Sequence, residues 1–223
     1  MTTEHPSKIL VIDIETISLE CKKIIGIGTC TINSGRIEHP YSCLINPGQP
    51  YDLPPDSVHN ITYEMSSSGR SFADIEDALI AEILDHCGYV AAYNSEFVRE
   101  CLTAAFTKQH LDLDIKWIDI LDMARNVLPP PHTLASVTAN LGIVHLDGPD
   151  ARDAAEVYLS ILNMPPITRV YLNTRYEDRE RCKALKCTFD PARKQWWCDE
   201  RRAHEMPPEW RIATRQTMKR DTS

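Results

Sequence analysis

The start of the chain alternates between apolar runs and turn-forming residues. Residues 8–14 (KILVIDI) form a β-branched apolar run that contains one acid, which is typical of a buried strand. Two further apolar runs, 24–32 and 37–45, flank Asn-Ser-Gly-Arg at 33–36. Because Asn, Ser and Gly are turn formers, this spacing favours a hairpin. The pattern therefore predicts an antiparallel meander of three strands.

Beyond an irregular, proline-rich stretch at 46–71, the apolar positions change to a helical period. Helices are predicted at 72–86, 95–107, 133–141 and 151–162, and short strands at 88–92 and 115–120. The second short strand runs into a further helix that stops before Pro129, and Pro165 follows the last helix. Three strands followed by alternating helices and strands predict an α/β fold, with helices flanking a mixed sheet.

Charge divides the chain of 223 residues into two parts. Residues 1–164 carry 10 Lys and Arg against 23 Asp and Glu, whereas residues 165–223 carry 14 against 9. A basic end favours contacts with phosphate groups, and a solvated basic surface is the alternative. We see no secretory signal and no apolar run near the roughly 18 residues that cross a bilayer, so we expect a cytoplasmic protein without membrane contact.

Eight cysteines are many for this length, and none forms a CxxC pair. Buried or free thiols are the ordinary interpretation in a reducing compartment. Cys182, Cys187, Cys198 and His204 are a candidate zinc set, but their spacing fits no common zinc finger.

Two acids, Asp13 and Glu15, stand at the end of the first predicted strand. Side chains at i and i+2 of a strand point to one face, where two carboxylates repel unless a cation lies between them. Hard oxygen ligands favour Mg²⁺ or Mn²⁺, and a phosphodiesterase with two such metals needs this kind of pair. The alternative is two strand-end acids in water.

Asp153 is a candidate third ligand, because it lies in the first turn of the last predicted body helix, beside its apolar stripe. Its alternative role is local. Asp150 would cap this helix, and Asp153 would be a first-turn acid that the helix dipole favours.

Six segments follow one another as ILVIDIETISLE, INPGQPYDLPPDSVHNITYEM, VAAYNSEFVRECL, WIDILDMAR, LASVTANLGI and DARDAAEVYLSIL. In this order they resemble the motifs of the DEDD superfamily of proofreading-type 3′→5′ exonucleases, and most closely the family of the DNA polymerase III epsilon subunit. The resemblance covers about residues 8–163. It implies an RNase H-like fold and the metal-dependent removal of nucleotides from the 3′ end of DNA or RNA.

The resemblance also implies roles for single residues. Asp13, Glu15 and Asp153 would be catalytic and would hold two ions, Mg²⁺ or Mn²⁺. The implied substrate-binding positions are Thr16, Leu19, His59, Asn94 and Phe97. For each of these positions a packing or turn role is the alternative.

The sequence departs from the family pattern in two places. Val98 stands where the second motif has a metal-binding Asp, and valine cannot bind a metal. Gly148 and Pro149 occupy the positions at which the two branches of the family carry the general base, a His or a Tyr. His145, eight residues before the last acid, is a candidate replacement base, and a surface histidine is the alternative.

Residues 169–198 read RVYLNTRYEDRERCKALKCTFDPARKQWWC, which predicts a strand, a short helix, a turn and a strand. This segment resembles a small domain of uncharacterised function that is appended to DNA-processing proteins. We therefore divide the chain into an exonuclease-like domain at 1–164, a small basic β-α-β domain at 168–202 and a tail at 203–223. Predicted nucleic-acid contacts of the small domain are Arg175, Arg179, Lys194 and Trp197. Burial of the tryptophan in a small core is the alternative.

Three functions remain open from the sequence. The first is a 3′→5′ exonuclease, weakened by Val98 and Gly148. The second is an inactive exonuclease fold that still binds nucleic-acid ends. The third is a module that associates with a DNA polymerase or another DNA-processing protein. Retention of Asp13, Glu15 and Asp153 together favours the first, and Val98 speaks against it.

Overall fold

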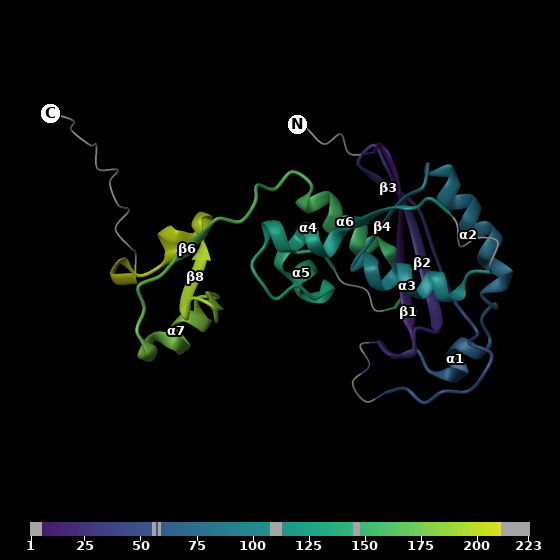
Figure 1. Cartoon of the computed structure of the whole chain (residues 1–223), viewed down its shortest axis with the longest axis horizontal. Helices are drawn as coiled ribbons and strands as arrows, with labels where there is room; N and C mark the ends of the chain where they lie inside the picture. Colours follow the sequence, from purple (N-terminus) through teal and green to yellow (C-terminus); the bar gives the residue numbers. More distant parts are fainter. Residues whose placement is uncertain (1–5, 55–56, 58, 108–112, 145–147, 211–223) are drawn as a thin grey trace. The chain divides into compact units, whose positions relative to one another are not determined.

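The computed structural model describes residues 6–54, 57, 59–107, 113–144 and 148–210. The chain divides into two compact units (Figure 1). The first comprises residues 1–125 and 131–164, and the second comprises residues 126–130 and 165–223. No helix among the described residues is both long and apolar enough to span a membrane.

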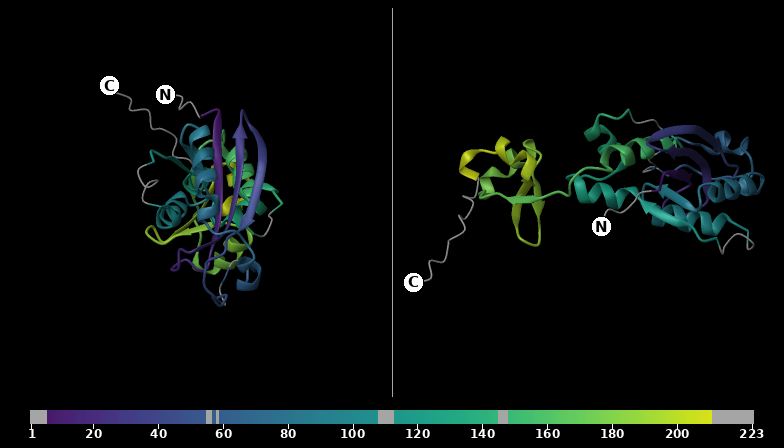
Figure 2. Two further views of the ribbon diagram at one scale, coloured as in Figure 1. Left: turned by 90° about the vertical axis from the view of Figure 1, so that its right-hand side faces the viewer. Right: turned by 90° about the horizontal axis from the view of Figure 1, so that it is seen from above.

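A mixed five-stranded sheet forms the centre of the first unit. Its strands are β1 (Lys8–Thr16), β2 (Ile24–Asn33), β3 (Arg36–Leu44), β4 (Tyr89–Ala92) and β5 (Lys116–Asp119). They lie in the order β3-β2-β1-β4-β5, antiparallel from β1 to β3 and parallel from β1 through β4 to β5. The three long strands run side by side in Figure 2. The predicted meander and the predicted α/β class are confirmed.

The β2–β3 hairpin shows why the sequence folds this way locally. Ser34 and Gly35 form its two-residue turn, with φ angles of 47° and 80°. A tight hairpin between right-twisted strands requires left-handed backbone at both turn positions, and glycine adopts it without steric cost. The turn fixes the register, in which Asn33 pairs with Arg36.

Most helices of this part of the chain lie where the apolar periodicity predicts them. They are α1 (Tyr63–Ser67), α2 (Ala73–Asp85), α3 (Ser95–Ala105), α4 (Ile120–Val127), α5 (Leu134–Leu141) and α6 (Ala151–Ile161). The sequence did not predict α1, which a hydrogen bond from the Met65 backbone N–H to the Thr62 side chain caps. Apolar residues of β1, α2 and α3 meet in one buried cluster, which fixes these helices on the sheet.

The second unit contains a three-stranded antiparallel sheet in the order β6-β8-β7. Its elements are β6 (Arg169–Tyr171), the 3-10 helix η2 (Tyr176–Asp178), α7 (Arg179–Ala184), β7 (Thr188–Asp190), β8 (Gln195–Asp199), η3 (Glu200–Glu205) and η4 (Pro208–Trp210). The predicted β-α-β order therefore lacked one strand. The segment that the sequence assigned to a turn contains β7, which pairs with β8.

The small domain also extends beyond residue 202, where the sequence analysis ended it. Met206 and Trp210 are 1% and 2% exposed and share a core with Leu172 and Cys198. Trp210 therefore belongs to the core of this domain and not to a tail. Polar residues surround it in sequence, so the local pattern did not indicate that it is buried.

Candidate functional site

The candidate site begins where β1 ends. Asp13 and Glu15 occupy alternate positions of β1, and a β-bulge follows between Glu15 and Thr16. Ile12 and Ile14, which alternate with the two acids, belong to the apolar cluster on the other face of the strand. The period of two therefore forces both carboxylates onto one face while the strand stays anchored in the core.

Two glycines on β2 make room beside this acidic face. Gly28 and Gly26 pair with Asp13 and Glu15. A Cβ atom on Gly28 would lie 2.1 Å from the carbonyl oxygen of Pro149, and one on Gly26 would lie 3.0 Å from Cγ of the same proline. Atoms cannot approach as closely as 2.1 Å, so the segment that leads into α6 reaches β2 only because Gly28 has no side chain.

The start of α6 brings further acids to this place. Asp150 caps the helix by accepting a hydrogen bond from the Arg152 backbone N–H at 3.0 Å. Asp153 follows in the first turn and is 2% exposed. Its burial shows that the carboxylate is not simply solvated, and its place in the first turn is also the one that the helix dipole favours. The cap predicted for Asp150 is present.

The charges of these acids act on one another. Burial and the negative charges of Glu15, Asp153 and Asp150 raise the pKa of Asp13 from 3.8 to about 8. Burial has the largest influence, followed by Glu15, and a hydrogen bond from the Ile14 backbone opposes both. The charges of Glu15, Asp153 and Asp150 thus all act on Asp13, and the joint role of Asp13, Glu15 and Asp153 as metal ligands stays a prediction.

Oxygen donors that repel one another are suited to a hard divalent cation. Within the described residues, no three His, Cys, Asp or Glu side chains are already gathered as metal ligands. The charges that raise the pKa of Asp13 nevertheless come from acids near it, and a cation between them would relieve the repulsion. The chemistry of Asp13, Glu15 and Asp153 therefore fits Mg²⁺ or Mn²⁺.

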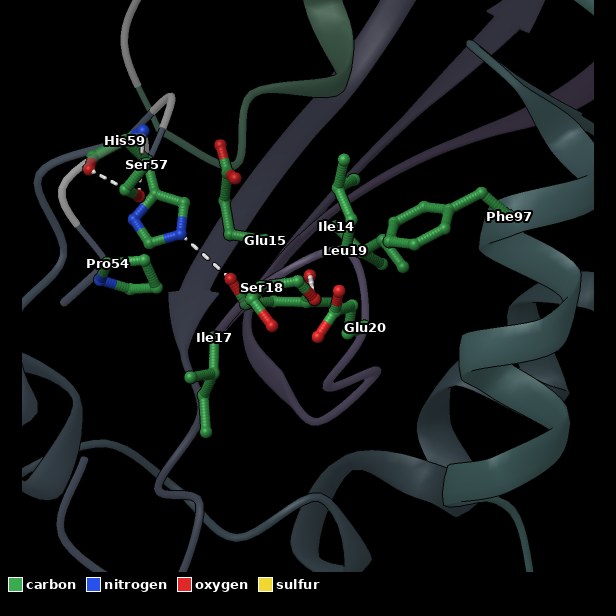
Figure 3. Close-up of a pocket in the computed structure, with 11 residues that line it drawn as sticks. Ile14, Glu15, Ile17, Ser18, Leu19, Glu20, Pro54, Ser57, His59 and Phe97 are labelled. Atoms are coloured by element: carbon green, nitrogen blue, oxygen red, sulfur yellow. Dashed lines mark hydrogen bonds between the residues drawn. The ribbon is translucent and has the colours of Figure 1, made fainter. Parts of the chain in front are cut away.

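A pocket of about 500 Å³ adjoins Glu15 (Figure 3). Residues that follow the acids on the chain, from Thr16 to Glu20, form one part of its lining. Phe97 points from α3 toward Leu19 and Ile14, and His59 lies across the pocket with Pro54 and Ser57. Leu19 is 78% exposed, so a large apolar side chain is presented to solvent at this pocket. The pocket thus combines apolar surface with an acidic edge.

His59 holds the loop of this pocket against β1. Its Nδ1 accepts a hydrogen bond from the Ile61 backbone N–H, so its Nε2 carries the proton and donates to the carbonyl oxygen of Thr16 at 2.8 Å (Figure 3). The Thr16 side chain donates to the carbonyl oxygen of Ser18 at 3.0 Å. Both predicted pocket residues therefore shape the backbone just beyond the acids.

The start of α3 depends on a residue that the sequence analysis did not identify. The Asp119 carboxylate accepts hydrogen bonds from the Ser95 backbone N–H at 2.7 Å and from the Ser95 hydroxyl at 2.8 Å. Asn94 precedes the helix with a left-handed φ of 64°, is exposed and makes no capping hydrogen bond with its side chain. Phe97, one turn later, packs partly on the core and lines the pocket. An acid at a strand end was the available signal for Asp119.

The predicted departure from the family pattern has a structural counterpart. Val98 is 3% exposed and belongs to the apolar cluster with Ile12 and Ile14. Glu100, one of the nearest acids in sequence, forms an ion pair with Lys22. Gly148 has a φ of 100°, which favours glycine, and neither it nor Pro149 carries a group that can accept a proton. His145 lies outside the described residues.

The residues predicted to contact nucleic acid in the small domain lie on different elements. Arg175 precedes η2, Arg179 begins α7 and is paired with Glu180 at 3.3 Å, and Lys194 is exposed in the β7–β8 turn. Trp197 is 4% exposed, and the Arg169 guanidinium covers its ring. The ring therefore packs within the domain and is not open for stacking on a base.

The three cysteines considered for zinc are core residues of the same domain. Burial raises the pKa values of Cys187 and Cys198 to about 11, and the Cys187 sulfur lies 3.4 Å from the sulfur of Met206. His204 is exposed. Within the described residues these thiols and His204 are not gathered as a metal site, and the buried thiols pack as small apolar side chains.

Comparison with known proteins points to one family. The family model RNase_T, described as Exonuclease, matches residues 10–158. The DNA polymerase III PolC-type of Thermotoga maritima is 29% identical over an alignment of 194 residues, which covers 81% of this chain. The chain spans only 14% of the length of that relative.

Solved structures show the same fold at lower identity. A product-bound structure of exonuclease I matches 72% of this chain and 44% of its own, with 18% identity and a TM-score of 0.55. A structure described as 3′-end specific recognition of histone mRNA stem-loop by 3′-exonuclease covers 78% of this chain and 89% of its own. Its identity is 18% and its TM-score is 0.55. The RNase H-like architecture predicted from the motifs is confirmed.

Proposed function

We propose that this chain, which belongs to the RNase_T exonuclease family, is a metal-dependent 3′→5′ exonuclease that hydrolyses phosphodiester bonds at 3′ ends of DNA or RNA. The observation that carries the proposal is the acidic group around Asp13, next to the pocket that Glu15, Leu19 and Phe97 line. In this arrangement a 3′-terminal nucleotide in the pocket has its phosphate beside the acids.

Each part of the site has its own task in this proposal. Asp13, Glu15 and Asp153 would hold Mg²⁺ or Mn²⁺, which supplies charge stabilisation at the phosphate and activation of water. Leu19 and Phe97 offer apolar surface to the terminal base and exclude water from it. The hydrogen bond from His59 to the Thr16 carbonyl holds the backbone between these two groups in place.

The test is a gel assay on 5′-labelled single-stranded DNA and RNA with Mg²⁺ or Mn²⁺. We expect a ladder of 3′-shortened products that EDTA and Asp153→Asn both abolish. Glu156→Gln is the matched control, because Glu156 lies one turn further along α6 and is partly exposed. Loss of products in the control, or their persistence in Asp153→Asn, would contradict the assignment of Asp153.

One observation favours a second function, an inactive module that binds nucleic-acid ends. Val98 is packed in the core where the family carries a metal ligand. The same gel distinguishes the two, because an inactive module gives no products at high protein concentration while still retarding the labelled strand. Association with a DNA polymerase stays a prediction, which rests on the likeness to the PolC-type relative.

A further inference from the structure

Three arginines of the second unit lie on aromatic rings. The pairs are Arg169 on Trp197 at 4.8 Å, Arg193 on Tyr171 at 4.6 Å and Arg181 on Trp210 at 4.9 Å, measured to the ring centres. A guanidinium on a ring face gains cation–π attraction and keeps its N–H groups directed outward along its plane. Such an arginine is already ordered before it meets a ligand, so it loses less entropy on binding.

The three pairs differ in how their charge is balanced. Arg181 forms an ion pair with Glu209 at 3.2 Å. Arg169 and Arg193 form no ion pair with any residue of the described part of the chain, and both are exposed. Arg169 and Arg193 are therefore exposed without a direct ion pair among the described residues, although the charge of Asp190 acts on Arg169, whereas Arg181 is paired directly with Glu209.

Arg169 and Arg193 share one face of the small sheet. Arg169 and Tyr171 are two residues apart on β6, so their side chains point the same way, roughly 7 Å apart along the strand. Trp197 is the cross-strand partner of Tyr171 on β8. Arg193 comes from the β7–β8 turn and lies on the Tyr171 ring. Alternate residues of the strands, among them Trp196, pack against the core on the opposite face.

Asp190 makes this face rigid. One of its oxygens accepts hydrogen bonds from the backbone N–H groups of Ala192 and Arg193 at 3.0 and 3.1 Å, which fixes the turn. The other accepts from the Tyr171 hydroxyl at 2.7 Å, which fixes the ring under Arg193. The carboxylate is thus committed to three donors within the domain.

The charges on the face sum to an excess of positive charge. The side chains of Arg169, Arg193 and the exposed Lys194 are positively charged, and the Asp190 carboxylate, which accepts hydrogen bonds within the domain, is negatively charged. Asp199, opposite Arg169 on β8, is 5% exposed and paired with Arg201, so it does not cancel this charge. An ordered array of guanidinium groups matches the oxygens of consecutive phosphates.

We propose that the sheet face carrying Arg169 and Arg193 (the arginine face) binds the phosphate backbone of the nucleic acid whose 3′ end enters the exonuclease site. The inference rests on the proposed function for the identity of the ligand, and it names a different part of the chain. It also relocates the predicted contact. Arg179 at the start of α7 is paired with Glu180, whereas Arg169 and Arg193 exceed the one negative charge of Asp190 near them.

The test measures the affinity of the full-length chain for labelled single-stranded DNA by fluorescence anisotropy, in EDTA so that nothing is cleaved, across a range of salt concentrations. The double variant Arg169→Gln, Arg193→Gln is expected to bind at least about tenfold more weakly. The slope of log K against log salt is expected to decrease in magnitude by about 1.4, since two phosphate contacts to a single strand are lost. Arg181→Gln is the matched control, because it removes a ring-stacked arginine whose charge is already paired, and it should change neither quantity.

A second variant, Arg169→Lys with Arg193→Lys, keeps both charges if the neutral variant disturbs the sheet. It should keep the salt slope and lose part of the affinity. Wild-type affinity and slope in the neutral variant, or an equal loss in Arg181→Gln, would overturn the proposal.

Displacement of the DNA by polyglutamate as readily as by unlabelled DNA would assign the face to acidic proteins and overturn it too. Hydrolysis of a nucleotide p-nitrophenyl ester, which is too small to span the two sites, tests the exonuclease function separately.

Discussion

The β1–α6 side of the candidate site is acidic, whereas the α3 side is apolar. On the first side burial and, after it, the negative charges of Glu15, Asp153 and Asp150 raise the pKa of Asp13 to about 8. On the second side Val98 stands 3% exposed within an apolar cluster. The first side is therefore arranged at a cost to the stability of the metal-free protein, whereas the second contributes to it.

This difference shows which residue of such a site can change without disturbing the packing of the fold. α3 must press its apolar stripe of Val98, Cys101 and Leu102 against the sheet, and a valine completes that stripe. Replacing an acid there by valine keeps the fold and removes chemistry alone. Apolar packing alone does not call for acids at positions 13 and 15, which supports the role proposed for them as metal ligands.

The largest effect should come from the acidic side. Asp13→Asn keeps the size of the side chain and removes its charge, so we expect exonuclease activity to fall by more than about 100-fold. Changes in groups that merely support metal ligands already cost about 10–100-fold. Val98→Ala is the comparison on the other side. It should lose about 1–2 kcal/mol of stability and retain activity within a few-fold.

The activities of the two variants together test whether the β1–α6 side contributes more to catalysis than the α3 side. Initial rates on labelled DNA with Mn²⁺, measured at a temperature where both variants are folded, give the comparison. Comparable losses in the two variants would mean that α3 contributes as much to catalysis as β1 does.

The acidic side should also make the metal-free protein sensitive to pH. The pKa of Asp13 is about 8 in the folded state against an ordinary value of 3.8, so between these values the folded protein holds a proton that the unfolded chain has released. Its contribution to stability is therefore fully present below about pH 4 and is lost as the pH rises through 8. Urea unfolding in EDTA at several pH values should show this decline, and Mn²⁺ should reduce it.

Asp13→Asn should flatten the decline, because asparagine does not titrate. Asp52→Asn, which changes an exposed acid, is the matched control and should leave the slope as it is. A slope that is the same in Asp13→Asn and in the wild type would show that Asp13 does not set it.

A smaller effect is expected from restoring an acid on the α3 side. Val98→Asp should raise the rate with Mn²⁺ by roughly tenfold, because position 98 is where the family that the sequence resembles carries a metal-binding Asp. In EDTA the same variant should be less stable by about 3 kcal/mol or more, since an unpaired charge is then buried. Val98→Asn is the control, because it has the shape of the aspartate without its charge. A folded Val98→Asp protein with no gain in rate would place α3 outside the chemistry.

Most of the fold could be predicted because it follows local periods. A few consecutive residues are enough to indicate the alternation in β1, the turn at Ser34 and Gly35, and the apolar stripe of α6. α1 and β7 were missed because they are short, five and three residues long, and the burial of Trp210 was missed because its core partners, such as Leu172, are distant in the sequence.

The candidate site was predictable to a different degree. Asp13 and Glu15 could be paired from their spacing of two, and the resemblance indicated Asp153. The route by which α6 reaches β1 could not be seen, because it depends on Gly26 and Gly28 lying opposite the acids in the register of β2. Asp119 escaped notice because its bond to Ser95 joins two strand ends that only the sheet brings together.

The same glycines provide the smallest and most local test of the acidic side. Gly28→Ala would put a methyl group 2.1 Å from the Pro149 carbonyl oxygen, which is backbone and cannot rotate away. We expect a loss of roughly 1–3 kcal/mol in stability and a several-fold loss of activity, since the start of α6 must shift and carries Asp153 with it. Gly26→Ala is the graded control, because its methyl group would meet the Pro149 ring at 3.0 Å and a small movement can relieve the contact. Thermal unfolding and the metal concentration for half-maximal activity should therefore change more in Gly28→Ala than in Gly26→Ala. Equal changes would mean that the close approach of α6 to β2 does not set the position of Asp153.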